Sequence, residues 1–130
     1  MPLKQSVIRL LDQLSPDAKA LGAVNCLHRT SDGSLVGHNT DWIGLHRLIV
    51  WHTIQTDRSQ SCALVIGSGG TAHAAVYALI QAGLQRVLVW NRTLSRAEEL
   101  VSNLGNVAGI SIVFECVRVC FIVVISILLC

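Results

Sequence analysis

A glycine-rich turn between two apolar stretches is the part of this sequence that most directly suggests chemistry. The apolar run Cys62–Ile66 leads straight into Gly67-Ser68-Gly69-Gly70, and small and large apolar residues alternate over residues 71–82. Glycines permit a tight turn and a close approach of the backbone to phosphate, and the first N–H groups of a following helix bind anions. The spacing Gly67-x-Gly69-Gly70-x-Ala72 in this context predicts a dinucleotide-binding loop, with a ligand-free glycine turn as the alternative.

The end of the next apolar run, residues 87–90, indicates which dinucleotide binds. In NAD-binding proteins an acidic residue here holds the ribose hydroxyls, but this chain continues with Asn91-Arg92-Thr93. Arg92 can pair with a 2′-phosphate and Thr93 can donate its hydroxyl to it, so the pattern favours NADP. A solvated surface arginine is the alternative for Arg92, and Arg96 is a weaker candidate. The loop residues expected to contact the cofactor are Gly67, Ser68, Gly69, Gly70, Thr71 and Ala72.

The elements around this loop alternate in type. Periodicity predicts a strand over residues 62–66, a helix over 71–82 closed by Gly83, a strand over 87–90 and a helix over 94–104 ended by Gly105. The continuous apolar run of the first strand predicts burial on both faces. Strand, helix, strand and helix in this order predict an α/β fold, the first half of a Rossmann-type nucleotide-binding domain with a parallel sheet.

The first half of the chain reads as a second α/β unit. We expect a helix over residues 5–14 and a second one that starts at Ser15-Pro16-Asp17, where Ser15 caps, Asp17 meets the positive helix end and Gly22 ends the helix. Strands over 23–29 and from residue 35 flank a turn at 31–33, and a helix covers 42–51. We expect residues 1–54 and 55–106 to be separate units, followed by an apolar tail, 107–130.

Composition excludes several classes of function. The chain has 130 residues, 52% of them hydrophobic, and a net charge of only +2, which gives no reason to expect nucleic acid. Five cysteines without a CxxC pair fit reduced thiols in a cytoplasmic protein. The histidines show no metal-ligand spacing, so we expect no metal. Residues 119–130 are almost wholly apolar but shorter than the about 20 residues of a membrane span; a buried strand is favoured over a membrane-associated tail.

Several short motifs together resemble the shikimate dehydrogenase family. They are Pro2-Leu3-Lys4, Leu14-Ser15-Pro16, Ala18-Lys19-Ala20, Gly22-Ala23-Val24-Asn25, Gly37-His38-Asn39-Thr40-Asp41-Trp42-x-Gly44, Gly67-Ser68-Gly69-Gly70-Thr71-Ala72 and Asn91-Arg92-Thr93. Their order and spacing agree with the family over roughly residues 2–104. The short sequences Pro-Leu-Lys and Gly-Gly-Thr-Ala are most similar to the shikimate dehydrogenase module of fungal-type multifunctional arom polypeptides or to its single-domain relatives.

The resemblance implies roles for residues that are unremarkable alone. Lys4 would otherwise be a surface charge, Asn25 a turn residue and Asp41 a helix cap. The resemblance implies that Lys4 and Asp41 are catalytic, that Asn25 binds substrate hydroxyls and that Asn91 joins Arg92 and Thr93 at the cofactor. It implies reversible hydride transfer between shikimate and 3-dehydroshikimate with NADP, in the pathway to chorismate and the aromatic amino acids. Other modules of this pathway are the implied partners.

Departures from the family pattern leave alternatives open. Family members have elements before the lysine and a second half of the nucleotide unit, so the resemblance implies a piece truncated at both ends, which we expect to be inactive alone. His73 stands where many members have an arginine near the phosphates. The alternatives are a quinate or quinate/shikimate dehydrogenase, a catalytically inactive relative that binds pathway metabolites, and a fragment tethered to a membrane through the apolar tail.

Overall fold

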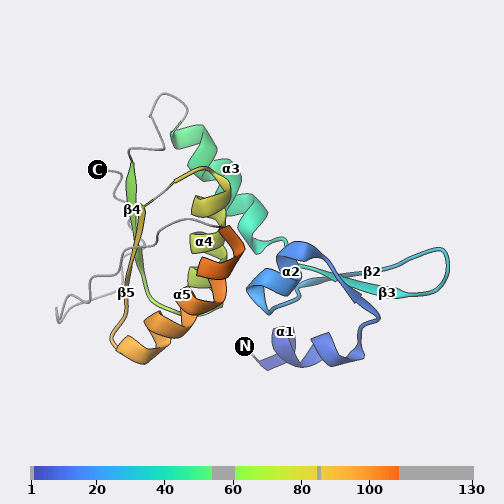
Figure 1. The fold of residues 1–130 in the computed structure, drawn as a ribbon. Helices are drawn as coiled ribbons and strands as arrows, with labels where there is room; N and C mark the ends of the chain where they lie inside the picture. The colour runs from blue at the N-terminus through green and yellow to red at the C-terminus, as the bar shows by residue number, and fades with distance from the viewer. Residues whose placement is uncertain (1, 54–60, 85, 109–130) are drawn as a thin grey trace.

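The first half of the chain forms a small sheet beside short helices. The structure is a computed structural model, and it describes residues 2–53, 61–84 and 86–108. The elements of this half are the helix α1 (Pro2–Ser6), the 3-10 helix η1 (Val7–Leu10), the strand β1 (Gln13–Leu14), the helix α2 (Pro16–Leu21) and the strands β2 (Cys26–Arg29) and β3 (Leu35–His38). The strand order is β1-β3-β2, with β1 parallel and β2 antiparallel to β3 (Figure 1).

The prediction of a single helix over residues 5–14 is wrong. Its place is taken by the end of α1, by η1 and by β1, which pairs with β3 in the register Gln13↔Val36. The Asp12 carboxylate also accepts a hydrogen bond from the Leu35 N–H at 2.7 Å. These partners lie more than twenty residues along the chain, and pairing with them outweighs the weak local preference for a helix.

The predicted start of α2 is confirmed. The Ser15 hydroxyl accepts a hydrogen bond from the Ala18 N–H at 3.4 Å, Pro16 occupies the first helical position, and Gly22 closes the helix with a left-handed φ of 59°. A glycine adopts this conformation at little cost, which is why the helix ends there. The predicted strand over residues 23–29 is shorter than expected, because β2 begins at Cys26.

The second half alternates helices and strands, as predicted. It contains the helix α3 (Asp41–His52), the strand β4 (Cys62–Ile66), the helix α4 (Gly70–Gln81), the strand β5 (Arg86–Trp90) and the helix α5 (Leu94–Ala108). The strands β4 and β5 are parallel, in the register Leu64↔Leu88, and α4 crosses between them. The α/β fold class is therefore confirmed. In Figure 1 the helices α3, α4 and α5 all lie on one side of this two-stranded sheet.

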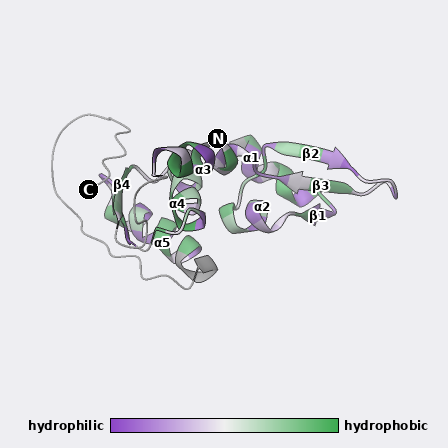
Figure 2. Cartoon of the chain, turned by 90° about the horizontal axis from the view of Figure 1, so that it is seen from above, coloured by the Kyte–Doolittle hydropathy of each residue, from purple (hydrophilic) through white to green (hydrophobic). Residues whose placement is uncertain are grey.

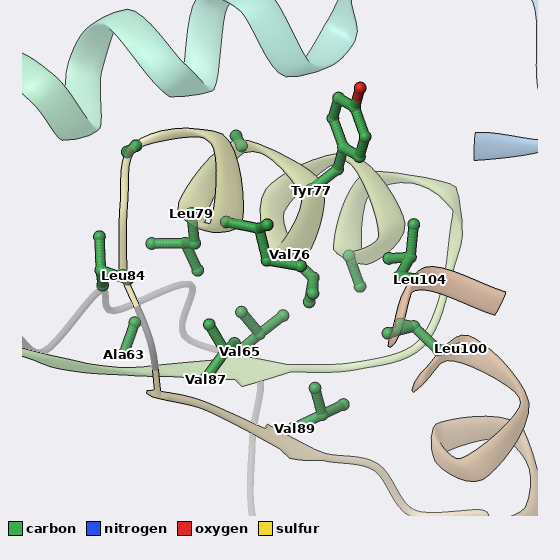
Figure 3. Packing of buried hydrophobic residues seen from close by; sticks show 14 of the residues in the cluster. Ala63, Val65, Val76, Tyr77, Leu79, Leu84, Val87, Val89, Leu100 and Leu104 are labelled. Atoms are coloured by element: carbon green, nitrogen blue, oxygen red, sulfur yellow. The ribbon is translucent and has the colours of Figure 1, made fainter. Parts of the chain in front are cut away.

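The main hydrophobic core lies between this sheet and α4. Figure 3 shows Val65 and Val87 pointing from the strands toward Val76 and Leu79 on α4, with Leu100 and Leu104 of α5 closing the end. Figure 2 shows hydrophobic residues on β4 and α4, whereas the far end of the β2–β3 hairpin is hydrophilic. The glycine loop is thus anchored at both ends by rigid, buried elements.

Two further expectations need correction. Gly105 does not end α5, which continues to Ala108; glycine costs only about 1 kcal/mol inside a helix, and the fully buried Leu100 and Leu104 hold the helix against the core. The strand β4 is not buried on both faces, because burial alternates along it and the odd-numbered residues face α4. Residues 107 and 108 of the expected apolar tail belong to α5 instead, and residues 109–130 lie outside the described residues. Among the helices in the described ranges, none is long and apolar enough to cross a bilayer.

Candidate active site

Three polar side chains from separate parts of the chain meet at the start of α3. The Lys4 ammonium on α1 donates to Oδ2 of Asp41 at 2.7 Å, and Nδ2 of Asn25 donates to Oδ1 of the same carboxylate at 2.7 Å. The structure thus brings together Lys4, Asn25 and Asp41, which are called the polar cluster below. Positions separated by up to 37 residues converge on one carboxylate, whose two oxygens are both engaged.

Backbone contacts hold the polar cluster in place. The Val24 N–H donates to the Lys4 carbonyl at 2.9 Å, which ties α1 to the segment that carries Asn25. Oδ1 of Asn25 accepts from the Thr40 N–H at 2.9 Å, so the amide bridges Thr40 and Asp41. Asn39 is buried, and its Oδ1 accepts from the Asp41 N–H at 3.0 Å. The turn before α3 therefore aims Asp41 at Lys4.

The ion pair in the cluster contributes little to stability. The Lys4 and Asp41 side chains are 33% and 39% exposed. Exposed pairs of this kind stabilise a fold by only about 0–1 kcal/mol, because water screens the charges and two side chains lose freedom. A gain in stability therefore does not explain why Lys4 and Asn25 are both oriented toward the Asp41 carboxylate.

The glycine loop follows β4 in a conformation that needs glycine. Gly67 has a φ of 112°, and its N–H donates to the Trp90 carbonyl at the end of β5 at 2.7 Å. No atom lies within 4 Å of where a Cβ would stand on Gly69 or Gly70. The residue before α4, Gly69, has no side chain to cap the first N–H groups of the helix. An anion can approach this backbone closely.

The residues after β5 lie at the same edge of the sheet as the loop. Asn91 donates from Nδ2 to the Thr93 carbonyl at 2.7 Å, and Arg92, Thr93 and Arg96 are exposed. His73, in the first turn of α4, contacts the Gly69 carbonyl through Nδ1 at 3.1 Å. Arg92 and Arg96 are thus both exposed near this edge of the sheet.

Cavities connect the polar cluster to the loop. One of about 410 Å³ is lined by Lys4 and Asp41 on one side and by Gly70 and Thr71 on the other. A larger groove of about 980 Å³ runs past Ser68, Gly69 and Gly70, with Arg96 and His73 beside it. Lys4 and Asn25 also border a third hollow of about 620 Å³ next to α1 and β2. The cluster can therefore meet a molecule that also reaches the loop.

Some of the site was not found from the sequence. Asn39, Thr40 and Trp42 belong to the motif around Asp41, but their contacts were not anticipated, and Gln5, which lines the 410 Å³ cavity, was not singled out. The burial of Asn39 within a polar motif is the signal that marks a structural hydrogen-bonding role. Over residues 2–53, 61–84 and 86–108, no group of three or more metal-ligating side chains gathers.

Comparison with known families and structures gives a consistent match. The family model "Shikimate / quinate 5-dehydrogenase" matches residues 51–128, and the model "Shikimate dehydrogenase substrate binding domain" matches residues 1–27. The first match covers more than half of the chain. It runs on past residue 104, where the agreement in motif order and spacing ends.

Individual relatives agree with this match. The pentafunctional AROM polypeptide of Candida glabrata is 39% identical over 101 residues, which are 78% of this chain and 6% of that polypeptide. A quinate dehydrogenase from Corynebacterium glutamicum in complex with NAD is 34% identical, with a TM-score of 0.79, over 88% of this chain and 40% of the other. A shikimate 5-dehydrogenase from Thermus thermophilus in complex with NADP(H) and shikimate is 36% identical, with a TM-score of 0.64, over 87% and 40%.

The chain spans about 6% of the length of the curated relatives and about 40% of the solved chains. The substrate-binding-domain match covers Lys4 and Asn25 of the polar cluster, and the other match covers the glycine loop, with Asp41 lying between the two matches. On this basis the chain belongs to the shikimate / quinate 5-dehydrogenase family.

Proposed function

We propose that this chain carries the catalytic and nucleotide-binding centre of an NADP-dependent shikimate dehydrogenase, which reversibly reduces 3-dehydroshikimate to shikimate. The observation that carries the proposal is the cavity of about 410 Å³ that the Lys4–Asp41 pair shares with the glycine loop. In this proposal residues 1–54 belong to the substrate-binding unit and residues 55–106 to the nucleotide-binding unit. Other shikimate-pathway modules are proposed partners, because one relative is a pentafunctional polypeptide.

The residues at the glycine loop fit a nicotinamide dinucleotide. Backbone at Gly69 and Gly70 has free space where a Cβ would stand, so a pyrophosphate can approach it. The loop residues Gly67 to Ala72 would hold the pyrophosphate. Arg92 and Thr93, with Asn91 beside them, would hold a 2′-phosphate, which is the reason to propose NADP over NAD. When bound, the nicotinamide supplies or accepts the hydride at the substrate carbon.

The polar cluster then supplies the proton. During reduction, the carbonyl oxygen of the substrate takes a proton from the Lys4 ammonium as its carbon gains the hydride; in oxidation the hydroxyl proton returns to the Lys4 amine. Asp41 accepts a hydrogen bond from Lys4 and so keeps the nitrogen in place. Asn25 donates one Nδ2 hydrogen to Asp41, and its other Nδ2 hydrogen would bind a substrate hydroxyl.

Quinate oxidation is the second candidate function. A specific observation favours it, since the relative with a TM-score of 0.79 is a quinate dehydrogenase in complex with NAD. The end of β5 speaks against NAD here, because Asn91-Arg92-Thr93 offers no carboxylate to ribose hydroxyls.

A substrate and cofactor panel tests the proposal. Because we expect the piece alone to be inactive, the assay uses the full-length polypeptide that contains it, which is called the full chain below. The full chain is assayed with shikimate or quinate and with NADP or NAD, following nicotinamide absorbance, and the binding of each compound is measured by calorimetry. We expect the highest kcat/KM with shikimate and NADP. A preference for quinate and NAD would favour the second candidate. Binding of shikimate without any turnover would instead identify an inactive metabolite-binding relative.

A further inference from the structure

Asp17 on α2 makes contacts that a helix-start residue does not need. Its Oδ2 accepts from the backbone N–H of Asn39 at 3.2 Å and from the indole Nε1–H of Trp42 at 3.2 Å. These donors lie 22 and 25 residues further along the chain. Both stand beside Asp41, one on each side of the turn into α3. One carboxylate oxygen therefore holds the segment that presents Asp41.

The first contact leads directly to the polar cluster. Asn39, whose N–H donates to Asp17, is only 3% exposed. Its side chain donates to the Ala23 carbonyl at 3.0 Å and accepts from the Asp41 N–H at 3.0 Å. A shift of the Asn39 backbone would therefore displace the Asp41 backbone, because the same residue holds both.

The second contact leads to the helix that follows the glycine loop. The Trp42 ring packs edge-on against Tyr77 of α4, with ring centroids 5.1 Å apart and planes at 84°. Tyr77 points away from the sheet core in Figure 3, on the opposite face of α4 from Val76 and Leu79. The hydrogen bond to Asp17 fixes the indole in the orientation that makes this contact. Asp17 thus connects α2, the start of α3 and α4.

The charge state of Asp17 suits this connection. Burial raises the pKa of Asp17, but hydrogen bonds from Ser15, Trp42 and Asn39 outweigh it and hold the pKa below its ordinary value. Burial, and then the Asp17 charge, raise the pKa of Tyr77. The carboxylate is therefore ionised at neutral pH beside a protonated phenol, and an ionised acceptor makes the stronger hydrogen bonds.

We propose that Asp17 is a positioning residue for the reaction, which holds Asn39 and Trp42 so that Asp41 faces Lys4 while Trp42 stays seated against Tyr77 on α4. This inference rests on the proposed function. A residue that served only to begin α2 would affect stability and leave turnover untouched. A positioning residue affects kcat, because small displacements of a reacting group slow the chemical step.

Steady-state kinetics of the full chain separate these two roles. We expect Asp17→Asn, which keeps the shape but loses the charge, to lower kcat by about tenfold to a hundredfold, with the KM for NADP within about twofold. Trp42→Phe keeps a ring against Tyr77 but loses the indole N–H, and should lower kcat in the same direction. The double variant should be no slower than the slower single variant, because both remove one interaction.

Asp12→Asn is the matched control. The Asp12 carboxylate also accepts a backbone N–H from a distant residue, Leu35, but it contacts neither Asn39 nor Trp42. We expect this variant to lower the melting temperature and to leave kcat unchanged. Equal losses of kcat in Asp12→Asn and Asp17→Asn would overturn the positioning role, and so would an unchanged kcat in Asp17→Asn.

Nuclear magnetic resonance keeps this proposal separate from the proposed function. In Asp17→Asn we expect the Trp42 indole N–H signal and the Asp41 carboxyl carbon signal to shift, while the indole signals of Trp51 and Trp90 stay in place. If the unaltered chain turns over neither shikimate nor quinate, the proposed function fails, but these shifts still uphold the positioning. An unmoved Asp41 signal contradicts it whatever the activity.

Discussion

Arg92 is the residue on which the proposed cofactor preference depends. Replacing it with alanine should weaken NADP binding by about tenfold to a hundredfold, since a charge-assisted hydrogen bond contributes about 1.5–3 kcal/mol, and should leave NAD binding unchanged. Arg86, exposed at the opposite end of the same strand, is the matched control. Calorimetric titration of both cofactors measures the effect. Equal weakening of NADP and NAD binding would contradict a 2′-phosphate contact.

Asp17 also predicts a pH dependence of stability. Its folded pKa lies below the ordinary 3.8, so it stabilises the fold above about pH 3.8, and this contribution is lost as pH falls through the lower folded value. At neutral pH the unaltered chain should therefore unfold at a higher urea concentration than Asp17→Asn, and the difference between the two midpoints should shrink on acidification. A difference that grows as the pH falls would contradict the assigned hydrogen bonds.

The role of a single residue can be predicted from the sequence in some cases and not in others. The roles expected of Lys4, Asn25 and Asp41 came from a family resemblance, and the structure adds the distances among these side chains. Asp17 was expected only to stabilise the start of α2. Its partners Asn39 and Trp42 are distant in sequence, and local patterns carry no information on which distant donor a carboxylate meets.

At the scale of elements, Gly67 controls the shape of the glycine loop. A side chain at its φ of 112° is strained, so Gly67→Ala should lower the free energy of unfolding by about 1–3 kcal/mol and weaken NADP binding. Gly44→Ala, inside α3, is the control, and its effect on the free energy of unfolding should have the opposite sign. A Cβ there meets no atom within 4 Å, and alanine should stabilise the helix by about 0.5–1 kcal/mol. Chemical denaturation measures both; a harmless Gly67→Ala would contradict the loop geometry.

Elements with strong local signals were predicted well. The Ser15 cap with Pro16 defines α2, and the apolar run with the glycine turn defines β4 and α4. The helix expected over residues 5–14 failed because pairing of β1 with β3 is not a local property. The prediction that α5 ends at Gly105 failed because the free energy gained by burying Leu104 in the core exceeds the local cost of a glycine in a helix.

At the scale of the whole molecule, the core under α4 supports the loop. Leu79 is 1% exposed between α4 and the sheet, so Leu79→Ala should lower the free energy of unfolding by about 2–5 kcal/mol through lost contacts and a cavity. Leu48 on α3 is 54% exposed, and Leu48→Ala is the matched control. It should lower the free energy of unfolding far less than Leu79→Ala does. Urea unfolding measures both. Similar losses for the two leucines would contradict this description of the core.

The proposed site depends on how the two sheets are joined. Helix α3 runs from the polar cluster at Asp41 to a packing contact with α4, and α2 packs against α4 and α5. The cavity between Lys4 and the glycine loop exists because of this arrangement. The sequence indicated both α/β units, but a shared cavity depends on side chains from both, which only the packed structure reveals.

The central claim is that Lys4 exchanges a proton with the substrate oxygen beside the bound nicotinamide cofactor, giving it in reduction and taking it in oxidation. Its most direct test compares Lys4→Ala with the unaltered full chain, measuring kcat for shikimate oxidation and the dissociation constant of NADPH. Loss of a general acid–base group predicts a kcat lower by about 10²–10⁴-fold, with NADPH affinity within about twofold. Arg47→Ala, which removes an exposed cation from α3, should change neither value. A Lys4→Ala variant that retains the kcat of the unaltered chain would contradict the account.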